Sequence, residues 1–133
     1  MIRLDKTRRF RPSSDAKGFL AYLKERAVFG RQIDAYAFAA AYAIKNNADI
    51  SEISLKGRSD LEEVGILDDE VCLALEAGIH AVQKRNGRAQ PENSQDVMDL
   101  VTKYAEVGLL LLKKKWVGKT GIQIQDDIRK VID

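Results

Sequence analysis

Residues 33–44 read IDAYAFAAAYAI, and this run is the strongest structural signal in the chain. Alanine has the highest helix propensity of the amino acids, and the run is apolar on almost every side. A helix of that kind belongs at the centre of a domain. Its alanines allow neighbouring backbones to approach closely, while Tyr36, Phe38 and Tyr42 supply bulk. We therefore predict a central helix over residues 32–45.

Further helices are predicted to pack around this centre. Apolar residues recur in them at the helical spacing of three and four positions. Residues that can cap a helix, or acidic residues, stand at the predicted starts, and basic residues near the ends of the later helices complement the negative end of the helix dipole. The predicted helices span residues 15–28, 69–85 and 94–115, and residues 126–133 also look helical.

The segment after the central helix, residues 48–67, is less regular. Ile53 and Leu55 alternate with polar residues, which permits one short strand, and residues 59–63 look like a cap followed by one helical turn. No internal repeat or long linker divides the chain. The predicted fold class is mostly α: a compact bundle of four to five helices with at most one short strand, forming a single domain over residues 1–133.

The composition is that of a soluble globular domain. The chain has 133 residues, of which 45% are hydrophobic and 32% charged. Its longest strongly apolar run, residues 107–112, is far shorter than the roughly 20 residues that cross a bilayer. No apolar segment follows the basic N-terminus, as a secretory signal would require. One cysteine cannot form an internal disulfide, and no Cys/His cluster is present to bind a metal. We expect a cytoplasmic protein without membrane contact, metal or cofactor.

Charge is distributed unevenly along the chain. Residues 1–31 hold nine Lys and Arg against three acids, a net charge of +6, whereas residues 48–76 hold nine acids against two basic residues, a net of −7. Further basic groups occur at residues 84–88 and 113–115. Such asymmetry favours two surfaces with different partners, or two surfaces that attract each other within a dimer. Ordinary solvated surface charge is the simpler alternative.

No convergent catalytic site is visible in the sequence. Residues 118–120 (GKT) end like a phosphate-binding loop, but the full pattern requires a glycine where the chain has Lys113. His80 is best explained as a hydrogen-bonded structural residue and Cys72 as a small core residue. The two do not suit a nucleophile and its base, because eight residues of helix place them about 12 Å apart. The acids at residues 68–70 are adjacent on a helix and therefore diverge. We expect a protein that is not an enzyme.

The N-terminal segment, residues 1–12, is the most plausible functional feature. Pro12 disfavours helix at the residue before it, so we expect an extended basic arm. Lysine and arginine contact phosphates, and an interleaved aromatic ring can pack or stack. The alternatives are a flexible solvated terminus, or an arm that docks on the acidic residues 48–76 of its own chain or of a second copy. The predicted nucleic-acid-binding residues are Lys6, Arg8, Arg9, Phe10 and Arg11.

Two sequence motifs support a family resemblance. Residues 29–41 read FGRQIDAYAFAAA, and residues 104–109 read YAEVGL. Together with the basic N-terminal segment and the acidic helix start at residues 68–70, they resemble a pattern of small bacterial accessory proteins encoded beside DNA phosphorothioation (sulfur-modification) genes. The resemblance spans residues 3–112. It implies a non-catalytic role in bacterial self/non-self DNA discrimination or its regulation, and it transfers no defined site residues.

We therefore expect a non-catalytic accessory protein that associates with DNA, or with a DNA-modification and defence complex, through its basic arm. The alternative is a protein-interaction or regulatory subunit that docks a larger enzyme through the acidic residues 48–76 or an apolar patch at residues 109–112. A homodimer is a further option. Phosphate binding weakens steeply with salt whereas apolar docking does not, so salt dependence separates the first two hypotheses.

Overall fold

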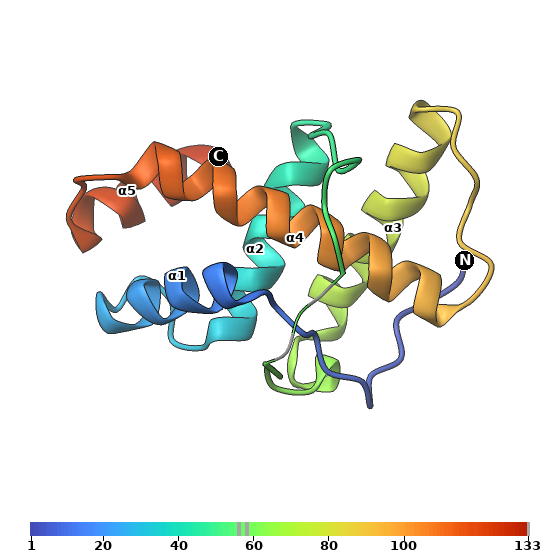
Figure 1. The fold of residues 1–133 in the computed structure, drawn as a ribbon, viewed down its shortest axis with the longest axis horizontal. Coiled ribbons are helices and arrows are strands. Elements are labelled where there is room, and N and C mark those ends of the chain that lie inside the picture. The colour runs from blue at the N-terminus through green and yellow to red at the C-terminus, as the bar shows by residue number, and fades with distance from the viewer. Residues whose placement is uncertain (56, 58, 133) are drawn as a thin grey trace.

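The computed structural model describes residues 1–55, 57 and 59–132, and its regular structure there is helical (Figure 1). No strand forms among these residues, and an isolated antiparallel bridge joins Arg9 to Glu63. The predicted all-α fold is confirmed. The elements are α1 (Ser14–Glu25), α2 (Gln32–Lys45), the 3₁₀ turn η1 (Val64–Ile66), α3 (Asp69–Arg85), α4 (Ser94–Trp116) and α5 (Gly121–Ile132).

Helix α2 forms the centre of the fold, as its alanine-rich sequence predicts. Its residues Ile33, Tyr36 and Ala40 are fully buried, and its bounds match the predicted 32–45. Helix α4 runs along the length of the molecule and crosses α2 (Figure 1). The two backbones meet closely at Gly108, where an added Cβ would clash with the carbonyl oxygen of Ala39. Small residues on both helices therefore make this crossing possible.

Helices α1 and α3 complete one continuous hydrophobic core with α2 and α4. Helix α1 buries Phe19, Leu20 and Leu23, while α3 buries Leu75 and Ile79. The apolar patch expected at residues 109–112 is divided between core and surface: Leu109 and Leu112 are buried, and Leu110 and Leu111 are exposed. Among the described residues, no helix combines the length and apolar character needed to span a bilayer.

Two predicted helix bounds are wrong. Helix α1 ends at Glu25 instead of residue 28, because Ala27 adopts a left-handed conformation with φ of 55° and the chain turns there. Helix α5 starts at Gly121 instead of residue 126. Its start is capped reciprocally, since the Thr120 hydroxyl accepts from Gln123 N–H and the Gln123 side chain accepts from Thr120 N–H.

The irregular segment before α3 also differs from the prediction. Leu55 is exposed and no strand includes Ile53 or Leu55, while the helical turn forms at Val64–Ile66 rather than at residues 59–63. The backbone N–H groups of Leu61 and Val64 instead donate to carbonyl oxygens of the N-terminal arm. Pairing with a distant part of the chain has replaced the local structure expected from the sequence.

Candidate nucleic-acid interface

The N-terminal arm is extended and docked on the acidic segment of its own chain. Three backbone hydrogen bonds hold it there: Leu61 N–H donates to Phe10 O at 3.1 Å, Val64 N–H to Arg8 O at 2.9 Å, and Gly65 N–H to Lys6 O at 2.9 Å. Of the arrangements open from the sequence, intramolecular docking is the one observed. The alternation of apolar and basic residues explains it, because Leu4 and Phe10 are buried while the charged residues stay outside.

The first part of the arm is tightly ion-paired. Arg3 bonds to Asp69 at 2.9 Å and to Glu76 at 2.8 Å, and Lys6 bonds to Asp69 at 2.8 Å. The Lys6 ammonium, and next the Arg3 guanidinium, lower the pKa of Asp69 by hydrogen bonding to its carboxylate. Lys6, a predicted nucleic-acid-binding residue, is therefore engaged with α3.

Phe10 lies in the core and does not present its ring to solvent. Its side chain is 1% exposed, and its ring centroid lies 5.4 Å from that of Tyr36 on α2. Of the two roles predicted for Phe10, packing is the one the structure allows, and stacking on a nucleic-acid base is excluded in this conformation. The aromatic residue among the arginines is an anchor that fixes the arm to the central helix.

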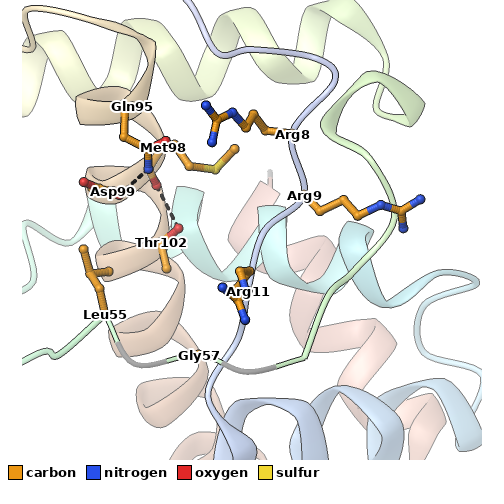
Figure 2. A pocket seen from close by; sticks show the side chains of 9 residues that line it. All are labelled: Arg8, Arg9, Arg11, Leu55, Gly57, Gln95, Met98, Asp99 and Thr102. Carbon is orange, nitrogen blue, oxygen red and sulfur yellow. Dashed lines mark hydrogen bonds between the residues drawn. The ribbon is translucent and has the colours of Figure 1, made fainter.

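Arg8, Arg9 and Arg11 of the arm line one pocket of about 280 Å³ against α4 (Figure 2). Figure 2 shows Arg8 reaching toward Gln95 and Met98, whereas Arg9 points away from α4. The Arg9 guanidinium donates to Leu61 O at 2.9 Å. The other lining residues are Leu55, Gly57, Asp99 and Thr102.

Arg8 and Arg11 are the least constrained cations of this pocket. Each side chain is 63% exposed, and their carboxylate partners are distant: Arg8 lies 3.8 Å from Asp5, and Arg11 lies 3.4 Å from Asp60. Exposed ion pairs with such long contacts contribute about 0–1 kcal/mol. An incoming phosphate can therefore displace Asp5 or Asp60 from its arginine at small cost.

The α4 wall adds polar groups that the sequence did not single out. Gln95 donates to Asp99 at 2.8 Å, and the Thr102 hydroxyl donates to Met98 O at 2.8 Å. The Asp99 carboxylate limits how deeply an anion can enter, so a phosphate would be held at the mouth of the pocket. No sequence signal linked α4 to the arm, because the two are joined only through tertiary packing.

The other basic groups do not extend this site. Residues 84–88 span the end of α3 and residues 113–115 lie in the last turn of α4, and these two helix ends lie at opposite ends of the molecule (Figure 1). Lys115 is engaged locally, 3.4 Å from Asp127. The two groups are thus separate from each other, and none of their residues is among those that line the arginine pocket.

The histidine and the cysteine both have structural contacts. The His80 ring nitrogens lie 2.8 Å from Gln90 Oε1 and 3.2 Å from Ile2 O, which ties the start of the arm to α3. Cys72 is buried with its thiol near Val64 O, and burial raises its pKa, which disfavours the reactive thiolate. Within the described part of the chain, no group of three or more His, Cys, Asp or Glu side chains converges as a metal site would require.

Comparison with known proteins yields no relative from which a function could be carried over. No protein-family model, no curated protein and no solved structure matches the chain.

Proposed function

We propose that this protein is a non-catalytic, cytoplasmic accessory protein that contacts DNA phosphates through Arg8 and Arg11. The observation that supports this most directly is the pocket they share: two exposed guanidinium groups from one extended segment, whose carboxylate partners among the described residues lie at 3.8 Å and 3.4 Å. Guanidinium groups bind phosphate oxygens with two parallel hydrogen bonds, and the backbone of the arm holds both arginines in position.

In the docked arm, fewer of the predicted residues are free to contact DNA. Lys6 is paired with Asp69, Phe10 is buried, and Arg9 donates to a backbone carbonyl. Two phosphate contacts are weak on their own, because most of the affinity of nonspecific DNA binding comes from the number of phosphates neutralised. This favours an accessory role, in which the protein adds affinity or orientation to a larger DNA-bound complex.

A place in bacterial DNA-modification defence is the biological setting we propose. It rests on the motifs at residues 29–41 and 104–109. Both motifs occupy the α2–α4 crossing: Ala39 meets Gly108 there, and the Tyr36 hydroxyl donates to Glu106 at 2.9 Å. The motifs thus account for the scaffold on which the arm is mounted, and the arm supplies the DNA contact.

The test is fluorescence anisotropy of a labelled DNA duplex, plain or phosphorothioated, titrated with the protein at several salt concentrations. With two phosphates contacted, we expect the logarithm of affinity to fall against the logarithm of salt with a slope of about −1.8. Arg8→Ala/Arg11→Ala should abolish binding and Arg8→Lys/Arg11→Lys should retain part of it. A preference for phosphorothioated DNA would support the defence setting.

A matched control is Lys84→Ala/Arg85→Ala, which removes the same charge from the end of α3. Binding that is lost equally in both double variants would show a diffuse charge effect and contradict a site at Arg8 and Arg11. Absence of binding at low salt would reject the DNA function.

The alternative, docking through the acidic residues 48–76, has less surface available. The arm covers part of it, with Glu63, Asp69 and Glu76 paired to arm cations.

A further inference from the structure

An apolar groove of about 420 Å³ lies between α2 and α3, on elements separate from the arginine pocket. Its walls combine aromatic and aliphatic side chains with alanines, and the alanines leave room between the two helices. Acidic side chains, Asp34 and Glu70, also line it. The apolar lining includes Phe29, Phe38, Ala41, Leu67, Val71 and Ala74.

Part of the apolar lining is open to solvent. Val71 is 38% exposed although the helical spacing of α3 would suit it to the core; the buried position is taken by its neighbour Cys72. Ala41 on α2 and Ala74 on α3 are also exposed. An apolar surface that is both concave and bordered by charged residues is typical of a protein-binding site.

The border of the groove is acidic. Asp34 is bound by Arg31 at 2.8 Å. The pKa of Arg31 is raised chiefly by that hydrogen bond and further by the charges of Asp68 and Glu62. Asp68 directly follows Leu67, which lines the groove. Among the described residues, Glu62, Asp68 and Glu70 have no ion-pair partner. Glu70 in the groove lining and Asp68 beside it are therefore acids without a paired cation in the described part of the chain.

We propose that this groove binds an amphipathic helix of a partner protein, with apolar side chains filling the groove and Lys or Arg side chains along the acidic border. Helices bind grooves of this kind through residues spaced three and four apart. Opposite charges around the apolar contact speed association and select the partner. The groove does not suit DNA, because its carboxylates repel phosphates. The inference is therefore independent of the arginine pocket.

The probe is a fluorescein-labelled synthetic peptide of about 18 residues, with leucines at helical spacing and lysines beside them. A second peptide has glutamates in place of the lysines. Anisotropy should show the lysine peptide binding at least about tenfold more tightly than the glutamate peptide, a difference of about 1.4 kcal/mol. Equal binding of the two peptides would overturn the role of the acidic border.

Variants of the groove test the place of binding. Val71→Asn/Ala74→Gln makes the apolar wall polar at exposed positions and should weaken the lysine peptide at least about tenfold. Ala41→Gln, on the opposite wall, is a second variant that gives an independent result if the first alters folding. Unchanged affinity in a folded groove variant would reject this site.

A charge-matched pair tests the border. Asp68→Asn/Glu70→Gln should weaken the lysine peptide and flatten its salt dependence, whereas Glu52→Gln/Glu92→Gln, two exposed acids away from the groove lining, should leave both unchanged. Equal effects of the two pairs would show attraction by net charge alone.

Sedimentation of the protein without peptide is the last check: a dimer that Val71→Asn/Ala74→Gln dissociates would assign the groove to a second copy and overturn the proposal.

Discussion

The carboxylate of Glu76 on α3 accepts a hydrogen bond from the backbone N–H of Leu4 at 2.7 Å, across 72 positions of sequence. The same carboxylate accepts from Arg3 at 2.8 Å, although the Glu76 side chain is 1% exposed. A buried acid is stable only when such partners compensate its charge. The pair therefore makes the N-terminal arm part of the folded structure.

Removing this carboxylate should loosen the arm. We expect Glu76→Ala to lower the free energy of unfolding by about 2–4 kcal/mol, because Leu4 N–H is left buried without an acceptor. Glu76→Gln keeps one acceptor oxygen and should cost less. Urea unfolding measures both, with the exposed Glu92→Ala as the control. An effect of Glu76→Ala no larger than that of the control would show that the arm is not fastened at this point.

The helix crossing should be intolerant of a single methyl group. Gly108→Ala places its Cβ against the Ala39 carbonyl and should destabilise the protein by about 1–3 kcal/mol or more. Gly18→Ala in α1, where nothing lies within 4 Å of the added Cβ, should instead stabilise it by about 0.5–1 kcal/mol. Thermal melting followed by circular dichroism compares the two. A stability change of the same sign for both substitutions would contradict the close approach of α2 and α4.

Mutations should separate the role of Phe10 in stability from the role of Arg8 and Arg11 in DNA binding. Phe10→Ala removes a ring buried against Tyr36 and should cost about 3–5 kcal/mol. Arg8→Ala/Arg11→Ala removes two exposed side chains and should change stability by less than about 1 kcal/mol while abolishing DNA binding. Chemical denaturation and anisotropy on the same samples give both results. A large stability loss in the arginine variant would make these residues structural.

Acid should release the first part of the arm. Lys6 and Arg3 lower the pKa of Asp69 in the folded state, so the stabilisation from these contacts is present above the ordinary value of 3.8 and is lost as pH falls through the lower folded-state pKa. The stability difference between the wild type and Asp69→Asn should therefore shrink between about pH 5 and pH 2. Urea midpoints at a series of pH values measure it. A difference that stays constant across this range would show that Asp69 is not charged in its contacts.

Elements with strong local signals were predicted well. The alanine-rich run gave α2 with its bounds, and the caps and closing basic residues of α3 and α4 placed those helices within a residue. Residues 48–67 were not predictable in the same way. Their backbone partners, including Phe10 and Arg8, lie about fifty residues earlier, and a local pattern carries no information on such pairing.

For the candidate site, the residue types indicated phosphate binding but not which side chains are free to bind. The basic arm was visible in the sequence, and Arg8, Arg9 and Arg11 do line one pocket. Whether each cation is free depends on which acids the fold places beside it. Lys6 is paired with Asp69 and is therefore not among the residues we propose to contact DNA. The periodicity of the arm did not show that Phe10 points inward, because a short extended segment can turn either face to the core.

What the sequence determined by itself was the helical class, the central helix and the uneven charge, since these depend on propensity and spacing within a few turns of chain. Tertiary structure alone decided that the arm neutralises the acid of its own α3, that Arg8 and Arg11 remain exposed, and that Val71 faces an open groove. These features arise from contacts between residues far apart in sequence, and electrostatic attraction and burial act on distance in space rather than along the chain.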